Sequence, residues 1–127
     1  MSELEFMRRL MLALGRRRDL RIWRQNVGRI QIRDDKGRLQ RVFMAGPPPG
    51  AADLSGIAIP DGWRLEIEVK SARGRQSPAQ KRWAEFIEQS GGVYVLVQLD
   101  PRLAMQDNVH QAVDAVDAAL LARRVSG

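Results

Sequence analysis

The stretch RLEIEVK, residues 64–70, alternates charged and apolar side chains without a break. Strict alternation is typical of a β-strand, because successive side chains of a strand point to opposite faces of its sheet. We therefore expect the apolar residues to face a core, and Glu66, Glu68 and Lys70 to share the other face. Glu66 lies one step further from Lys70 than Glu68 does, and we interpret it as a solvated strand residue.

A hairpin is predicted immediately before this strand. Residues 54–59 form a short apolar run, and the turn dipeptide Asp61-Gly62 joins that run to residues 64–70. Asp53 opens the earlier strand, so the hairpin brings it beside Glu68. Two carboxylates that converge repel each other unless a cation lies between them, and oxygen ligands favour Mg²⁺ or Mn²⁺ over zinc.

Lys70 lies two residues beyond Glu68 on the same strand face. There its ammonium group would hold an attacking water or offset negative charge on a phosphorus centre. The backbone carbonyl of Val69, between the two side chains, is a candidate further metal ligand. An acid and a lysine on one strand face are also typical of a solvated strand, so the interpretation depends on Asp53 and on the helix that follows.

The remaining periodicities predict an α/β fold. Ser77-Pro78-Ala79-Gln80 carries the serine, proline and glutamine of a capping box, and the helix that it begins has Trp83, Phe86 and Ile87 on one face. Trp83 is expected to be a core residue. Further elements are predicted at residues 3–14 (a helix with Ser2 as its N-cap), 20–33 (strand-like), 41–44 (a strand after a turn at 34–37), 93–97 (a buried strand) and 107–124 (a helix). This order predicts one domain over residues 1–127, with a mixed sheet flanked by helices.

The composition narrows the classes of function. Lysine and arginine outnumber aspartate and glutamate by 21 to 15, and most of the basic residues are arginines. Arginine pairs with phosphate oxygens two at a time, which suits a nucleic-acid partner, although a high-GC genome gives the same bias. Cysteine is absent and His110 is the sole histidine, which argues against disulfides, thiolate sites and zinc. Without a signal-peptide pattern or an apolar run of membrane length, we expect a cytoplasmic protein with no membrane partner.

Several segments together resemble the PD-(D/E)XK nuclease superfamily, and in particular its virus-type replication-repair nuclease domain, VRR-NUC. They are residues 50–53 (GAAD), 68–71 (EVKS), 74–80 (GRQSPAQ) with Trp83, and, upstream, 23–28 (WRQNVG). The resemblance extends over about residues 3–97. It implies a restriction-endonuclease-like core of helix, three strands, helix and strand, which hydrolyses DNA phosphodiesters with Mg²⁺ or Mn²⁺. The chain departs from the family pattern at Ala52, where the family has a proline before the aspartate.

The resemblance also implies roles for individual residues. The metal ligands and catalytic groups would be Asp53, Glu68, Lys70 and the carbonyl of Val69. A glutamate of the first helix is expected to join them; Glu3 shares a face with the apolar residues of that helix, and Glu5 is the alternative. Gln80 matches a glutamine near the metal, although its spacing from Ser77 is also that of a capping box, and both can hold at once. Five polar residues that flank the site are candidate phosphate contacts, although each is also typical of a solvated surface: Arg24, Asn26, Arg73, Arg75 and Lys81.

The function expected from these residues is DNA cleavage by one or two metal ions. Small members of the family resemble phage and bacterial resolvases, so we expect a structure-specific endonuclease for branched DNA such as Holliday junctions, acting in replication, recombination or repair without an organic cofactor. A junction has two strands to cut, which favours a twofold homodimer, and apolar surface at Ile22, Phe43 and residues 54–59 is consistent with one. A flap- or restriction-type nuclease is the first alternative, and a non-catalytic DNA-binding module that keeps the fold is the second.

Overall fold

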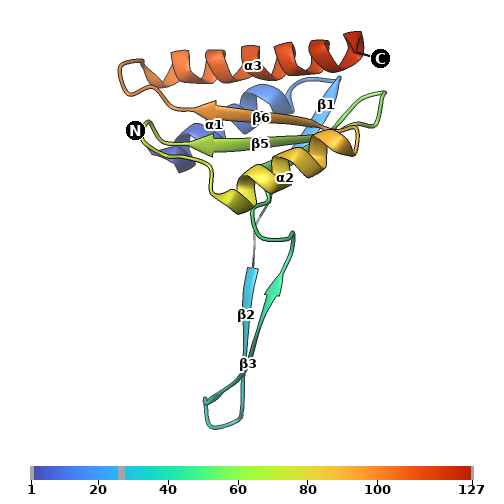
Figure 1. Cartoon of the computed structure of the whole chain (residues 1–127). Coiled ribbons are helices and arrows are strands. Elements are labelled where there is room, and N and C mark those ends of the chain that lie inside the picture. The colour runs from blue at the N-terminus through green and yellow to red at the C-terminus, as the bar shows by residue number, and fades with distance from the viewer. Residues whose placement is uncertain (1, 26–27, 127) are drawn as a thin grey trace.

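A mixed four-stranded sheet forms the centre of the chain. The computed structural model describes residues 2–25 and 28–126. Within them the elements follow in the order α1 (Glu3–Gly15), β1 (Leu20–Arg24), β2 (Gly28–Arg33), β3 (Leu39–Ala45), β4 (Leu54–Ala58), β5 (Arg64–Lys70), α2 (Pro78–Gln89), β6 (Val93–Gln98) and α3 (Met105–Val125). Figure 1 shows helices on both sides of the sheet, so the predicted α/β fold with a mixed sheet and flanking helices is confirmed.

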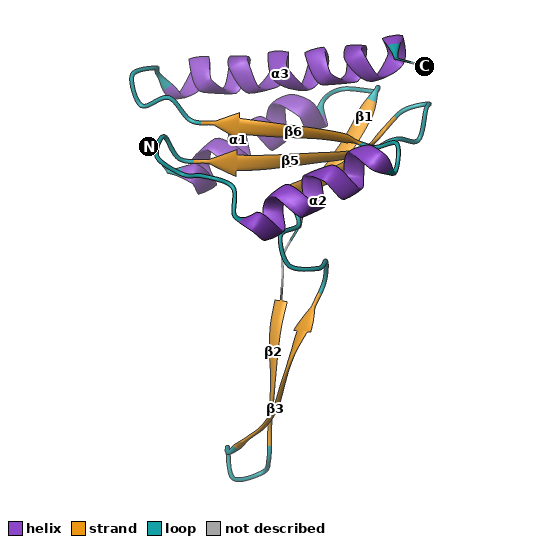
Figure 2. Cartoon of the chain, viewed as in Figure 1, coloured by secondary structure: helices purple, strands orange, loops and turns teal. Residues whose placement is uncertain are grey.

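The main sheet has the strand order β1-β4-β5-β6. Figure 2 shows β5 and β6 side by side in this sheet. β4 runs antiparallel to both β1 and β5, whereas β5 and β6 are parallel. In the predicted β4–β5 hairpin, Leu54 lies opposite Ile67. Continued by one residue, this register places Asp53 opposite Glu68.

The core lies between the sheet and the helices α1 and α3. It includes Phe6 and Leu10 from α1, Val116 and Leu120 from α3, and the apolar face of β5, which consists of Leu65, Ile67 and Val69. Each of these side chains is at most 3% exposed, because α1 and α3 cover that face of the sheet. The predicted apolar face of residues 64–70 is therefore confirmed. In the part of the chain that the structure describes, no helix is long and apolar enough to cross a membrane.

Residues 20–33, which have a strand-like pattern, form two strands that belong to different sheets. The sequence did not predict this division. β1 belongs to the main sheet, whereas β2 pairs with β3 in a separate two-stranded sheet. β1 and β4 pair as far as Arg24 opposite Leu54, where β4 begins, so the chain beyond Arg24 has no further β4 residue to pair with. The predicted turn at residues 34–37 is present and joins β2 to β3.

Hydrogen bonds close the capping box at the start of α2. The Ser77 hydroxyl accepts a hydrogen bond from the backbone N–H of Gln80 at 3.1 Å, and the Gln80 side-chain oxygen accepts one from the backbone N–H of Ser77 at 2.8 Å. The predicted capping box is confirmed. The prediction of one inner apolar face for α2 is wrong in part, because Ile87 is buried but Phe86 is 52% exposed. Phe86 stacks on Trp83, with ring centroids 5.5 Å apart, and does not reach the sheet core.

Replacing Ser77 with alanine should lower the free energy of unfolding by about 1 kcal/mol, because the N–H of Gln80 loses its acceptor. Urea unfolding followed by circular dichroism measures the change. Ser90→Ala is the matched control, since Ser90 is an exposed residue at the other end of α2 that caps the helix through its backbone N–H. An equal loss of stability in the two variants would contradict the capping role.

Candidate functional site

Asp53 is fixed between two segments of the main sheet. Its carboxylate Oδ2 accepts a hydrogen bond from the backbone N–H of Val69 at 2.8 Å, and its carbonyl accepts one from the backbone N–H of Gln25 at 2.8 Å. The first contact extends the β4–β5 pairing beyond Leu54 by means of a side chain. Asp53 is therefore held in place at the end of β5 where the charged residues lie.

Glu68 is a buried carboxylate with unequal surroundings at its two oxygens. Oε1 accepts a hydrogen bond from Gln80 Nε2 at 3.3 Å and lies 3.8 Å from Lys70 Nζ. Oε2 is buried and has no hydrogen-bond partner among the described residues. Burial is the largest cause that raises the pKa of Glu68 to about 8; the negative charge of Asp53 raises it further, and Lys70 opposes the rise. The charge of Lys70 is too weak to offset burial and the charge of Asp53, so the pKa of Glu68 remains raised.

The oxygen atoms at this position suit a hard divalent cation. Glu68 Oε2 is buried without a partner, and a cation beside it and Asp53 would relieve the repulsion between the two carboxylates. The Val69 carbonyl points to the same edge of β5 as the Val69 N–H that reaches Asp53, because both groups of an extended residue face one neighbouring strand. Among the described residues, no three acidic, histidine or cysteine side chains cluster closely enough to hold a metal by themselves. A cation here would therefore depend on two side chains together with backbone and water oxygens.

The two candidate glutamates of α1 differ in their surroundings. The negative charge of Glu3 contributes to the raised pKa of Glu68, so Glu3 lies near enough to act on the site. The Glu5 carboxylate instead pairs with Arg9, whose Nε lies 3.1 Å from Glu5 Oε1. Of the two, Glu3 is the one whose charge acts on Glu68, although its side chain is exposed.

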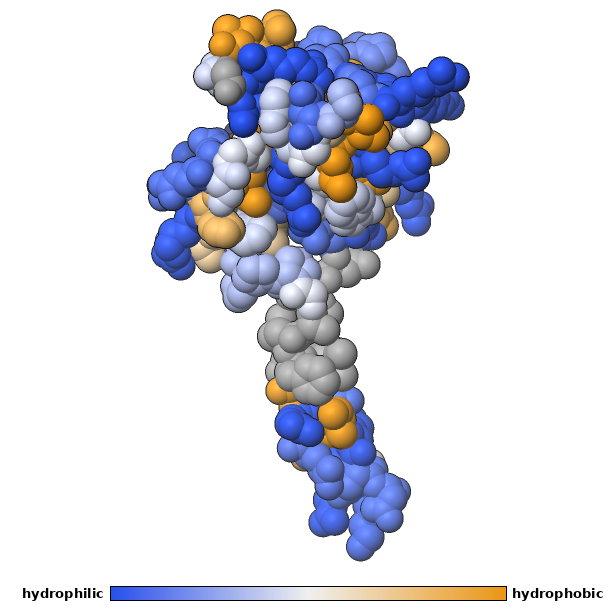
Figure 3. Space-filling model, turned by 90° about the vertical axis from the view of Figure 1, so that its right-hand side faces the viewer, coloured by the Kyte–Doolittle hydropathy of each residue, from blue (hydrophilic) through white to orange (hydrophobic). Residues whose placement is uncertain are grey.

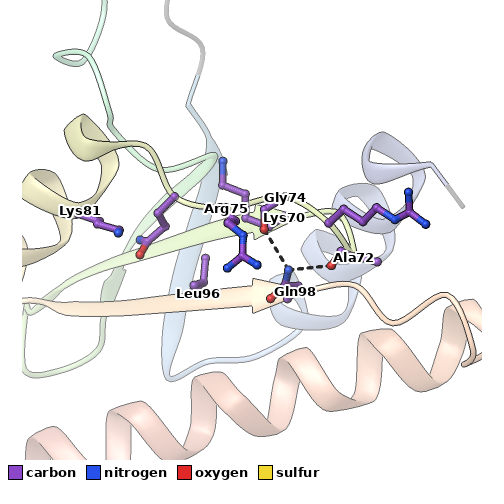
Figure 4. Close-up of a pocket in the computed structure, with 9 residues that line it drawn as sticks. Lys70, Ala72, Gly74, Arg75, Lys81, Leu96 and Gln98 are labelled. Atoms are coloured by element: carbon purple, nitrogen blue, oxygen red, sulfur yellow. Dashed lines mark hydrogen bonds between the residues drawn. The ribbon is translucent and has the colours of Figure 1, made fainter.

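A basic cavity opens beside Lys70. It has a volume of about 490 Å³ and is lined by Lys70, Ala72, Arg73, Gly74, Arg75, Gln76, Lys81, Leu96 and Gln98 (Figure 4). Three of the predicted phosphate contacts, Arg73, Arg75 and Lys81, thus lie in one cavity with the candidate catalytic lysine. Arg24 is exposed at the end of β1, next to β4, and does not line it. Asn26 lies outside the described residues.

Gln98, which the sequence did not single out, organises the loop that carries the arginines of this cavity. Its side-chain amide nitrogen lies within hydrogen-bonding distance of the carbonyls of Ser71 (3.2 Å), Ala72 (3.0 Å) and Gly74 (3.0 Å), as Figure 4 shows in part. Gln98 is the partner of Lys70 in the parallel β5–β6 pairing. The sequence indicates only that Gln98 follows the predicted buried strand. Its position beside Lys70 becomes evident once the β5–β6 pairing is known.

The interpretation of Glu66 as a solvated residue is wrong. Glu66 is 0% exposed, and its carboxylate accepts a hydrogen bond from the indole Nε1–H of Trp83 at 2.8 Å and one from Arg64 Nε at 3.4 Å. The reason is that α2 covers this face of the sheet and brings Trp83 over the strand. The expectation that Trp83 is a core residue is wrong: the side chain is half-buried outside the sheet core and anchors α2 through its indole N–H.

Gln80 closes the predicted capping box and also contacts Glu68. Its side-chain oxygen closes the capping box at Ser77, and its side-chain nitrogen donates to Glu68 Oε1. The N-terminus of α2 is thereby tied directly to the buried carboxylate. By contrast, His110 is exposed on α3.

A comparison with protein-family models finds none that matches the chain, and a search of curated proteins finds no match either. The assignment of a function therefore rests on the residues and their geometry.

In the absence of metal, the stability of the protein should fall as pH rises from about 4.5 to about 8. The unfolded chain releases the Glu68 proton near pH 4.5, whereas the folded protein keeps it until about pH 8, so the folded state binds more protons between these values. Glu68→Gln removes this proton. As pH rises across this window, the free energy of unfolding of Glu68→Gln should therefore increase relative to that of the wild type.

Urea unfolding at pH 5, 6.5 and 8.5 in a chelating buffer measures this difference. Glu85→Gln, on the exposed side of α2, is the matched control and should follow the wild type across the series. Parallel pH profiles for the wild type and Glu68→Gln would show that Glu68 is not protonated in the folded protein.

Gln98→Leu should loosen the loop between β5 and α2, because the carbonyls of Ser71, Ala72 and Gly74 lose their shared donor. Limited trypsin digestion reports this, since the loop contains Arg73 and Arg75, and we expect cleavage there to be roughly tenfold faster. Gln89→Leu, an exposed change at the end of α2, is the control. Unchanged digestion of the Gln98→Leu loop would contradict the organising role.

Proposed function

We propose that this chain is a metal-dependent DNA endonuclease of the PD-(D/E)XK type, related to the VRR-NUC domain. The observation that carries the proposal is the buried Glu68 carboxylate opposite Asp53, with one partnerless oxygen and with Lys70 3.8 Å from the other. Burying Glu68 beside a second carboxylate is costly, and such arrangements are concentrated at functional sites. The resemblance of the surrounding segments to the family supports the same conclusion.

Mg²⁺ or Mn²⁺ would be held by Asp53, Glu68 and the Val69 carbonyl, and Glu3 would add negative charge near the ion without being one of a cluster of three carboxylates in the described chain. When bound, such an ion supplies Lewis-acid polarisation of the phosphate and a lower pKa for a bound water. The protein groups then have separate tasks. Asp53 is oriented by the Val69 N–H, Glu68 by Gln80, and Lys70 donates hydrogen bonds to the attacking water or to phosphate oxygens that gain charge.

The basic cavity supports a phosphodiester substrate. Arg73 and Arg75 on the β5–α2 loop and Lys81 on α2 line it together with Lys70, so a nucleic-acid backbone lying there would place phosphates beside Glu68. The guanidinium groups are suited to binding phosphate oxygens in pairs. These features support DNA as a polyanionic substrate, and the resemblance extends the proposal to branched DNA such as Holliday junctions, in phage or bacterial DNA processing.

A twofold homodimer is part of this proposal, because a junction presents two strands to cut. Only some of the apolar residues that we expected at such a dimer contact are exposed on the surface. Ile57 and Ile59 are exposed, Ile22 is partly buried, Leu54 and Ala58 belong to the core, and the Phe43 side chain lies outside the described residues. The exposed isoleucines support a dimer contact near β4 and the loop after it.

Asp53→Asn and Lys70→Ala should each reduce the rate of DNA cleavage in Mg²⁺ at least a hundredfold while leaving DNA affinity within about threefold of the wild type. Asparagine keeps an oxygen acceptor for the Val69 N–H, so Asp53→Asn removes charge with little change of shape. Cleavage of four-way junctions, flaps, nicked, single-stranded and linear duplex DNA, each in Mg²⁺ and Mn²⁺, measures the rates and identifies the substrate.

Asp114→Asn is the matched control, because it makes the same chemical change at an exposed position of α3. Calorimetric titration with Mn²⁺ adds a readout that needs no cleavage: the wild type should bind and Asp53→Asn should not. Undiminished cutting by either variant would overturn the site assignment. DNA binding without metal binding or cleavage would instead assign a non-catalytic DNA-binding module.

A further inference from the structure

The hairpin formed by β2, the turn at residues 34–38 and β3, which we call the arm, projects away from the main sheet (Figure 1). Within the described residues its two strands pair only with each other. A two-stranded hairpin alone in water is marginally stable, so a projecting one is expected to gain contacts from something outside its own chain segment. The nature of that contact follows from the side chains of the arm.

The tip of the arm presents cations. Its described charged residues are Arg33, Lys36, Arg38 and Arg41 against Asp34 and Asp35, and Figure 3 shows a hydrophilic surface at this end. The Asp34 carboxylate is occupied within the turn, because it accepts hydrogen bonds from the backbone N–H groups of Lys36 (2.9 Å) and Arg38 (2.8 Å) and from Arg38 Nε (3.0 Å). These hydrogen bonds lower the pKa of Asp34, and the one from the Arg38 backbone N–H has the largest effect. Lys36 and Arg41 are exposed and extend the positive surface.

Part of this positive surface is rigid. The guanidinium of Arg33 donates to the Gly37 carbonyl at 3.1 Å and to the side-chain oxygen of Gln31 at 2.8 Å. A side chain that is already ordered loses less conformational entropy when it meets a ligand. The arm is thus a positively charged ribbon in which the guanidinium of Arg33 is already held in place.

Both ends of the arm are joined to the candidate site. Gln25, three residues before β2, donates its backbone N–H to the carbonyl of Asp53 at 2.8 Å. After β3, Gly50 approaches α2 so closely that a Cβ atom built on it would lie 2.4 Å from the carbonyl oxygen of Ala79, and its φ of +89° is a glycine conformation. Ala79 is the neighbour of Gln80. The segments that flank the arm on both sides therefore contact residues next to Asp53 and Gln80.

We propose that the arm binds in the major groove of duplex DNA next to the phosphodiester bond that the site cuts, an inference that rests on the proposed nuclease function. The major groove, about 12 Å wide, admits a two-stranded β-ribbon. The six residues of β2 span about 20 Å at about 3.3 Å per residue, which is long enough to follow the groove past the phosphate backbone. A second copy of the chain is the less suitable partner, because charged side chains are depleted from the centres of protein interfaces. On this proposal, the substrate must contain duplex DNA next to the bond that is cut.

The double variant Lys36→Gln/Arg41→Gln tests this assignment and keeps the hydrogen bonds of the turn, because Lys36 contributes only its backbone N–H to them. Binding to a 24-base-pair duplex and to a single strand of equal length is measured in a chelating buffer over a salt series. We expect about tenfold weaker duplex binding near 0.1 M salt, and a slope of log K against log salt that is smaller by about 2, because each lost phosphate contact contributes about 0.9. Single-strand binding should stay within about twofold of the wild type.

Two further variants serve as controls. Arg8→Gln/Arg18→Gln removes the same charge from exposed positions of α1 and the loop after it, and Lys36→Arg/Arg41→Lys keeps the charge of the arm. Both should bind duplex like the wild type. An equal loss in the α1 control, or unchanged duplex binding by the arm variant, would overturn the proposal. A change of oligomeric state in the arm variant with unchanged duplex binding would also overturn it, and would make the arm a contact between copies.

Dimethyl sulfate footprinting identifies the groove, because the reagent methylates N7 of guanine, which lies in the major groove. The wild type should protect guanines that the arm variant leaves reactive, and equal reactivity in the two complexes would overturn the major-groove assignment. Because binding is measured without metal, this result is separable from the proposed function. If the wild type protects guanines but never cuts DNA, the proposed nuclease function is refuted. If the wild type cuts DNA and the arm variant binds duplex as the wild type does, only the proposal for the arm is refuted.

Discussion

The hydrogen bond from the backbone of Val69 to the carboxylate of Asp53 is the contact on which the candidate site depends. It joins the segment before β4 to the end of β5 at 2.8 Å, beyond the residues that the two strands pair directly. Because it fixes Asp53 opposite Glu68, the second carboxylate is buried beside a negative charge, and its pKa rises to about 8. Gln80 and Lys70 then provide the hydrogen bond and the positive charge that partly offset this burial.

Those features that are decided within a few residues could be predicted from the sequence. The alternation over residues 64–70 identifies the two faces of β5, and the Asp61-Gly62 turn fixes the hairpin that brings Asp53 to Glu68. The capping box at Ser77 is likewise encoded in four residues, since short-range hydrogen bonds close a helix terminus. The position of the carboxylate pair follows from these local patterns without knowledge of any long-range contact.

Features that distant segments decide could not be predicted in this way. Glu66 follows the same alternation as Glu68, and only the placement of α2 over that face shows that it is buried under Trp83. The role of Gln98 depends on the parallel pairing of β5 with β6, which are separated in sequence by α2. Similarly, the division of residues 20–33 depends on where β4 begins, since a strand pattern does not reveal where its partner ends. Sequence patterns assign a residue to a face, but the neighbouring element decides whether that face is solvated.

Glu66 and Glu68 differ in whether the fold satisfies their carboxylate oxygens. Both are buried on the same face of β5, two residues apart. Glu66 has donors from Trp83 and Arg64, so its charge is satisfied within the fold. Glu68 keeps one buried oxygen without a partner in the described chain and faces a second carboxylate, an arrangement that a glutamine would relieve if stability alone mattered. Since a cation would satisfy that oxygen and both charges together, its binding and the release of the Glu68 proton are expected to be coupled.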